Sequence, residues 1–338
     1  MYQPIRSAAL AAVALAGGSG LLLPARAFGA GEIYWFSLLS ENVYSAMTFY
    51  SDLFGWEIVS GPTGGFIALR NGQPFAALNE IEDRMPASPE SLWLAAITVE
   101  DVAQSVSTAR MLGATIHEDV TELPGWGIFA LIQDPQGAPL LLVDPARPLG
   151  DREGYSGWRW AELWTHDPAA AADFYTKVIG YELEAVPIGD QTYEVFRSSG
   201  GRNAGLVQLD RPEIAARWAP YVGVTDLRAI LVRVWEEGGM VLREPAEVSN
   251  AAAGADRVAL IADPSGAALF LYQLEEEAVA DPGVAERASR GTAAEGARPV
   301  DTRDGPHVHM SASVGYGFGG GWSASAPGYP YGPFGPRF

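Results

Sequence analysis

The stretch FYSDLFGWEI at Phe49–Ile58 recurs as FYTKVIGYEL at Phe174–Leu183. Such self-similarity indicates that one folding unit occurs twice in the chain. The match extends upstream, where the segment that begins at Trp35 aligns without a gap to the segment that begins at Trp160, and downstream into a D-P-x-G-A sequence in each copy. We therefore predict two copies of one domain of about 115 residues, which is an ordinary domain size.

The composition indicates a globular protein with well-filled cores, because 48% of its 338 residues are hydrophobic and only 19% are charged. Its net charge of −19 would repel phosphate backbones and anionic lipid surfaces, so we expect no nucleic-acid partner. The chain has no cysteine, which excludes disulfides, a thiolate nucleophile and a thiolate metal site.

The N-terminal residues 1–30 are typical of a secretory signal peptide. A short cationic start, MYQPIR, precedes the apolar run Ser7–Leu23, and PARAFGA then supplies an A-x-A cleavage site. The alternative is an uncleaved membrane anchor or a buried helix, but the run is short for a span of about 20 residues and its glycines weaken a helix. We expect export to the periplasm or the extracellular space, with no membrane span left after cleavage.

The hydrophobic periodicity predicts the order strand, helix, strand, strand, strand, which occurs twice in each domain. We expect the domains at 31–147 and 155–276. The elements predicted in the first domain are, in chain order, strand Ile33–Leu39, helix Tyr44–Leu53, strands Glu57–Ser60, Phe66–Arg70, Phe75–Leu78 and Leu92–Val99, helix Val102–Leu112, and strands Thr115–Val120, Ile128–Ile132 and Leu140–Val143.

The C-terminal residues 277–338 differ in composition from both domains. They begin without a sustained apolar face and end in a run rich in Gly, Pro and aromatic residues, so we predict a disordered tail. The tail fits either a self-association segment with weak multivalent contacts or a solvated extension without an assigned task.

The paired βαβββ modules, the FY-x-x-x-x-G-[WY] segment and the D-P-x-G-A turn resemble the vicinal oxygen chelate superfamily, also called the glyoxalase/bleomycin resistance/dioxygenase proteins. The resemblance covers roughly Gly31–Leu274 and is greatest to bacterial two-domain glyoxalase-like proteins. It implies an α+β fold of tandem glyoxalase-like domains, in which the paired modules of each domain form a half-open barrel.

Members of this family hold a divalent metal with His, Gln or carboxylate side chains on the strands that line the cleft. The matching positions here are Trp35, Leu94, Leu141, Trp160, Ala219 and Phe270. None of these side chains offers the nitrogen or oxygen donors that such a cation requires. We therefore expect no metal and no other cofactor, which disfavours the metal-dependent isomerisation, ring cleavage and epoxide opening of the family.

Alternate residues of a strand share a face, so Trp160, Glu162 and Trp164 would line one side of the second cleft, opposite Tyr221. We predict that the two tryptophans and Tyr221 bind a ligand. The tryptophans fit the packed core of a barrel equally well.

Glu162 is the candidate general base and His166 its candidate acid partner. A carboxylate between two tryptophans would be partly desolvated, which raises its pKa and suits it to this role. The alternative is that Glu162 points to solvent or pairs with Arg159 or Arg197, since surface carboxylates are the commoner case. In that case His166 only helps to start the helix beside Asp167.

In the first cleft the matching strand offers Trp35 and Ser37 as ligand-binding residues. Arg197 and its counterpart Arg70 stand at the ends of matching strands, where they would either hold a substrate carboxylate or remain exposed charges.

These observations favour an exported protein that binds a small, aromatic molecule in a metal-free cleft. The alternative is a metal-independent lyase, isomerase or hydroxylase-like enzyme that uses Glu162 as its base, and a third reading is an interaction module with a vestigial cleft. We expect a monomer, because four modules in one chain can complete two clefts.

Overall fold

The computed structural model describes residues 29–61, 65–70, 72–81, 90–123, 127–146, 158–188, 191–248 and 256–274. Residues 1–28 of the predicted signal peptide 1–30 and the whole predicted C-terminal tail lie outside these residues. None of the helices within the described ranges is long and apolar enough to cross a membrane.

The first domain contains the predicted elements in the predicted order. Its first module comprises β1 (Ile33–Ser40), α1 (Val43–Phe54), β2 (Glu57–Ser60), β3 (Phe66–Arg70) and β4 (Gln73–Glu80). Its second module comprises β5 (Leu92–Thr98), α2 (Val102–Met111), β6 (Thr115–Leu123), β7 (Gly127–Gln133) and β8 (Pro139–Pro145).

The second domain repeats this order. Its modules comprise β9 (Trp158–Thr165), α3 (Pro168–Ile179), β10 (Glu182–Ile188), β11 (Gln191–Ser198) and β12 (Gly201–Gln208), followed by β13 (Arg217–Val224), α4 (Leu227–Glu236), β14 (Met240–Val248), β15 (Asp256–Ala262) and β16 (Ala268–Gln273).

Each domain forms one mixed, 8-stranded sheet, with the order β2-β3-β4-β1-β5-β8-β7-β6 in the first domain and the corresponding order in the second. In both, the first strands of the two modules pair antiparallel, while the first strand of a module runs parallel to its last strand. The edge strands are unpaired within this order, so neither sheet closes into a full barrel. The predicted α+β fold of paired modules in half-open barrels is therefore confirmed.

The helices begin where the sequence places a good N-cap. A side-chain oxygen accepts a hydrogen bond from the backbone of the first turn at Asn42, Asp101, Asp167 and Asp226. The FY-containing helices α1 and α3 end at Gly55 and Gly180, which adopt left-handed backbone conformations.

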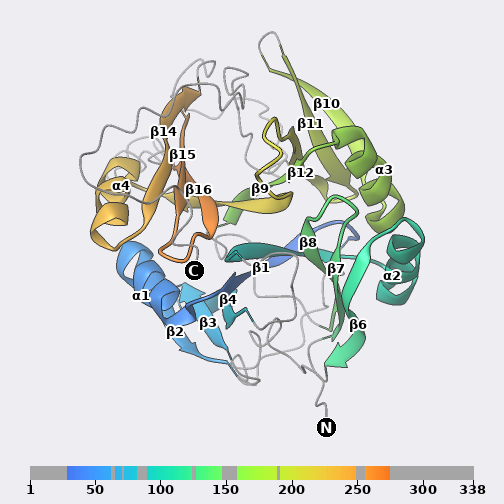
Figure 1. Cartoon of the computed structure of the whole chain (residues 1–338), viewed down its shortest axis with the longest axis horizontal. Helices are drawn as coiled ribbons and strands as arrows, with labels where there is room; N and C mark the ends of the chain where they lie inside the picture. Colours follow the sequence, from blue (N-terminus) through green and yellow to red (C-terminus); the bar gives the residue numbers. More distant parts are fainter. Residues whose placement is uncertain are drawn as a thin grey trace, which may run out of the picture.

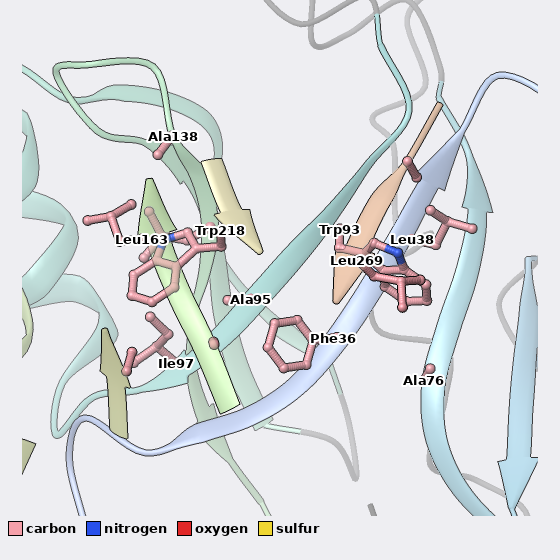
Figure 2. Close-up of a cluster of buried hydrophobic side chains, with 14 of the residues drawn as sticks. Phe36, Leu38, Ala76, Trp93, Ala95, Ile97, Ala138, Leu163, Trp218 and Leu269 are labelled. Carbon is pink, nitrogen blue, oxygen red and sulfur yellow. The ribbon is translucent and has the colours of Figure 1, made fainter. Parts of the chain in front are cut away.

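The two domains share one hydrophobic core, to which both sheets and the helices α1, α2, α3 and α4 contribute. In Figure 1, α1 lies beside α4 and α2 beside α3, with the sheets between the two helix pairs. Figure 2 shows Leu163 and Trp218 of the second domain in the same cluster as Phe36 and Ile97 of the first. The domains are therefore packed back to back around a common interior.

The FY helix of each domain is hydrogen-bonded to the D-P-x-G-A turn of the other. Tyr50 of α1 donates through its hydroxyl to Asp263 Oδ2 at 3.1 Å, and Tyr175 of α3 donates to Asp134 Oδ2 at 3.0 Å. All four side chains are buried. We call this pair of hydrogen bonds the reciprocal latch.

The second oxygen of each latch carboxylate holds its own turn together. Asp263 Oδ1 accepts from the amides of Ser265 at 2.9 Å and Ala267 at 3.0 Å, and Asp134 makes the matching bonds. Burial nevertheless raises the pKa of Asp134, and it raises the pKa of Asp263 to about 6.

We predict that Asp263 makes stability depend on pH between about 4 and 6. Its folded pKa of about 6 exceeds the value near 3.9 of an unfolded aspartate, so the folded state binds this proton more tightly. The contribution of Asp263 to the free energy of unfolding is about 2–3 kcal/mol. It is fully present below the unfolded pKa and is lost as pH rises through the folded pKa. Urea unfolding of wild type and Asp263→Asn at pH 7 and pH 4.5 measures this contribution.

Asparagine can still accept from the turn amides, and Asp134 titrates in both proteins, so the difference between them isolates Asp263. The unfolding free energy of wild type should rise relative to that of the variant as pH falls. Parallel pH profiles for the two proteins would contradict the prediction.

Candidate functional site

Each sheet has two chemically different faces because alternate residues point in opposite directions. One face contributes to the shared core, and we call the other, turned away from the helices, the open face. The first open face is lined by Trp35, Leu39, Ile67, Ala77, Leu92, Leu94, Ala96, Phe129, Leu141 and Val143. The second is lined by Trp164, Val207, Leu209, Ala219, Tyr221, Val258, Leu260, Phe270 and Tyr272, with Trp160 and Tyr193 half-buried beside them. Each cluster contains residues of one domain only.

Glu162 is fully buried on the second open face, between the two tryptophans of β9. Tyr193 donates through its hydroxyl to Glu162 Oε1 at 2.8 Å, and Trp164 Nε1 donates to Oε2 at 3.1 Å. Trp160 Nε1 in turn donates to the Tyr193 oxygen at 3.2 Å. Both carboxylate oxygens of this side chain therefore accept hydrogen bonds from aromatic side chains of the same sheet. The alternative in which Glu162 points to solvent is therefore wrong.

Small residues on the neighbouring strands make room for this network. Gly205 of β12 and Ala219 of β13 are paired with Glu162 on either side. A Cβ atom at Gly205 would lie 1.7 Å from the Tyr193 hydroxyl oxygen and 3.2 Å from Glu162 Cγ. Tyr193 therefore reaches Glu162 only because residue 205 has no side chain.

An aromatic row crosses the second open face beside Glu162. Tyr221 of β13 is paired with Trp160 of β9 and with Phe270 of β16. The rings of Tyr221 and Phe270 are stacked with centroids 4.2 Å apart, and Trp164 meets Phe270 edge-on at 5.6 Å. This row offers flat apolar surface next to a buried carboxyl group.

The residues at the family's metal-ligand positions do not fit a divalent cation. Trp160, Ala219 and Phe270 in the second domain, like their counterparts in the first, present hydrocarbon or an indole N–H, which donates and cannot coordinate. Within the described ranges, no group of three or more His, Cys, Asp or Glu side chains could hold a metal ion. The donor chemistry thus gives no basis for a metal-dependent step here.

Two predicted site residues lie apart from Glu162. His166 is half-buried in the bend after β9, four positions beyond Glu162, and at about 3.3 Å per residue this spacing corresponds to about 13 Å along an extended strand. Arg197 is exposed near the end of β11 and forms an ion pair with Glu184 at 3.3 Å. The structure therefore gathers Trp160, Glu162, Trp164 and Tyr221, but it places neither His166 nor Arg197 beside the carboxylate.

The first open face lacks this arrangement. Trp35 and Ser37 are buried there, with Ser37 at the position that matches Glu162. The strand registers place Gly65 where the second domain has Tyr193, and Ala77 where it has Gly205. The sequence reasoning missed Tyr193 and Gly205, although this contrast between the copies was the signal that could have identified them.

A model of the family described as the Glyoxalase/Bleomycin resistance protein/Dioxygenase superfamily matches residues 33–142. "Putative glyoxylase CFP32" of Mycobacterium tuberculosis is 27% identical over 245 residues, which cover 70% of this chain and 92% of that protein. "Anthracycline biosynthesis protein DnrV" of Streptomyces peucetius is 27% identical over 269 residues, which cover 74% and 95%.

Solved structures share the fold at low sequence identity. The Mn(II)-bound glyoxalase from Novosphingobium aromaticivorans superposes with a TM-score of 0.51 at 16% identity, covering 84% of this chain and 99% of that one. The 2,2',3-trihydroxybiphenyl 1,2-dioxygenase from Sphingomonas wittichii strain RW1 superposes with a TM-score of 0.50 at 14% identity, covering 72% and 91%.

We predict that Gly205→Ala breaks the Tyr193–Glu162 hydrogen bond, because the new methyl group displaces the tyrosine ring. Losing one donor to a buried carboxylate should lower the free energy of unfolding by about 2–3 kcal/mol. Urea unfolding of a double-mutant cycle with Tyr193→Ala provides the control. The cost of Gly205→Ala should fall by about 1–3 kcal/mol in the Tyr193→Ala background, because the clash is gone. An equal cost in both backgrounds would exclude this role for Gly205.

Proposed function

We propose that this tandem member of the glyoxalase/bleomycin resistance/dioxygenase superfamily is an exported protein that binds a small aromatic molecule on the open face of its second sheet. The site contains no metal and is centred on Glu162. The observation that carries the proposal is a buried carboxylate held by Tyr193 and Trp164 beside a row of aromatic rings.

The geometry favours a planar ligand that carries an N–H or O–H donor. Trp160 and Tyr193 are half-buried and form the solvent-facing part of the site, with Glu162 beneath them. Rings of this kind offer a ligand offset or edge-on stacking. The carboxyl group of Glu162 lies directly beneath these rings, so it can attract a cationic ligand that is stacked on them.

The relatives support the same class of ligand. Two of them, from Streptomyces, are named for anthracycline biosynthesis, and anthracyclines have a planar aromatic ring system. Export rests on the cationic start, apolar run and A-x-A sequence of residues 1–30.

Catalysis is the second candidate, and the hydrogen-bonded chain Trp160–Tyr193–Glu162 favours it. This chain connects half-buried rings to a buried carboxylate. A proton taken from a bound substrate by the Tyr193 oxygen would be balanced by transfer of the Tyr193 proton to Glu162 Oε1. Such a step requires no metal and would make Glu162 the terminal base.

We predict that wild-type protein binds 1-naphthylmethylamine more tightly than 1-naphthol, and 1-naphthol more tightly than 1-naphthoate. The order follows from attraction or repulsion by the Glu162 carboxylate. Isothermal titration calorimetry, with tryptophan fluorescence as a second signal, measures the three affinities. Glu162→Gln keeps the side-chain shape and should weaken binding of the amine by about tenfold, while 1-naphthol should change little.

Met111→Ala, at an exposed position of α2 away from both open faces, is the control and should leave all three affinities unchanged. Absence of saturable binding by every member of the set, or identical binding of the amine by Glu162→Gln, would refute the binding proposal. If the protein converts a bound compound and Glu162→Gln abolishes the conversion without abolishing binding, the enzyme reading replaces it.

We also predict that ligand binding is independent of metal. The purified protein should contain no stoichiometric Zn, Mn, Fe or Ni by elemental analysis, and dialysis against EDTA should leave the affinity for 1-naphthylmethylamine unchanged. A stoichiometric metal whose removal abolishes binding would overturn the metal-free site.

A further inference from the structure

We propose that the open face of the first sheet is a second, chemically different binding site, in which Asn79 recognises an uncharged ligand that presents a hydrogen-bond donor next to an acceptor. This site is separate from the Glu162 site, and its existence does not depend on the function proposed for that site.

Asn79 lies on β4 and points to the first open face. Its neighbour Leu78 belongs to the shared core and Ala77 to the open face, so alternation directs Asn79 to the open face as well. The strand register places Asn79 beside Leu39 of β1, and it places Ala77 beside Ser37. Asn79 is only 1% exposed.

Neither polar atom of the Asn79 side chain, Oδ1 or Nδ2, has a hydrogen-bond partner among the residues that the structure describes. Buried amides of native proteins are paired in the great majority of cases, with protein groups, water or a ligand. A buried amide whose acceptor and donor are both unpaired lowers the stability of the fold. A bound molecule that pairs with both atoms of Asn79 would remove this cost.

The surroundings hold the amide in place. Residue 65 has a left-handed backbone, with φ of +69°, and a Cβ atom there would lie 2.2 Å from Asn79 Oδ1. Gly65 therefore provides the space that the amide occupies. At the matching positions of the second domain, Tyr193 replaces Gly65 and Val207 replaces Asn79.

The two open faces thus carry opposite kinds of polar group. The second presents a carboxylate, Glu162, whereas the first presents the hydroxyl of Ser37 and the amide of Asn79 at the corresponding strands. Trp35 and Ile67 supply apolar surface on the same face. An ionic ligand would lose its hydration here without gaining a charged partner from these residues, so the site favours a neutral molecule.

A lactam is the simplest complement to this amide. Its N–H can donate to Asn79 Oδ1 while its carbonyl accepts from Nδ2, and both groups lie on one edge of a ring. An aromatic ring fused to the lactam would occupy the apolar surface. Isoquinolin-1(2H)-one is therefore a suitable probe, and its N-methyl derivative, which lacks the donor, is the matched control compound.

We test the site by isothermal titration calorimetry on the full chain with these two compounds. Wild type should bind isoquinolin-1(2H)-one saturably and should bind the N-methyl derivative about tenfold more weakly, because one hydrogen bond is lost and a buried acceptor stays unpaired. Asn79→Leu should reduce the affinity for the lactam about tenfold or more and should no longer distinguish the two compounds. Met111→Ala, at an exposed position of α2 away from both open faces, is the control variant and should bind the lactam as wild type does.

Urea unfolding gives an independent reading. Asn79→Leu removes an unpaired amide without removing volume, so the ligand-free variant should be at least as stable as wild type, and saturating lactam should stabilise wild type but not the variant. If the variant fails to fold, the comparison of the two compounds on wild type is repeated with the Glu162 site saturated by 1-naphthylmethylamine, and the preference for the lactam should persist. Equal affinity for both compounds, or no saturable binding with only ordered water at Asn79 in a crystal structure, would overturn the proposal.

Discussion

The arrangement of this protein depends on the reciprocal latch between Tyr50 and Asp263 and between Tyr175 and Asp134. Each bond joins the helix after the first strand of one domain to the turn before the last strand of the other. The helix α3 follows β9, the strand that carries Glu162, so the position of the candidate site is tied to a turn in the opposite domain. Because all four groups are buried, breaking either bond would leave a carboxylate without its donor in a low-dielectric interior.

Further contacts between the helix pairs support the latch. Ser105 of α2 donates to the Val178 carbonyl near the end of α3 at 2.8 Å, and Arg233 of α4 donates to the carbonyls of Asp52 and Leu53 at the end of α1. In each pair, a side chain of one helix thus donates to carbonyl groups at the end of the other helix, where the helix itself provides no donor. The two domains behave as halves of one folded body.

The repeat and the alternation of apolar residues predicted the modules and nearly all element positions, because these depend on local periodicity. The role of the FY and D-P-x-G-A motifs was not predicted. Both motifs appeared to mark a shared domain fold, whereas Tyr50 and Asp263 bond across the two copies. Such a contact joins residues far apart in sequence, and no local pattern of a single chain specifies which copy supplies the partner.

The candidate site shows the same limit. Alternation on β9 correctly placed Trp160, Glu162 and Trp164 on one face, but the burial of Glu162 depends on β11 and β12. Tyr193 covers the carboxylate only because Gly205 is small, and that fit between neighbouring strands is set by sheet register. Asn79 escaped notice for a related reason, since a single amide in a strand gives no sequence pattern and becomes informative only when its burial is known.

The shared core has a consequence for how such a chain arises. One domain alone would expose the face that the other now covers, and a second identical copy related by twofold symmetry would satisfy the same tyrosine–aspartate bonds in both directions. Joining the copies in one chain makes assembly independent of protein concentration. It also removes the requirement that both halves be identical. The open faces, which point away from the common interior, were then free to acquire a carboxylate in one half and a neutral amide in the other.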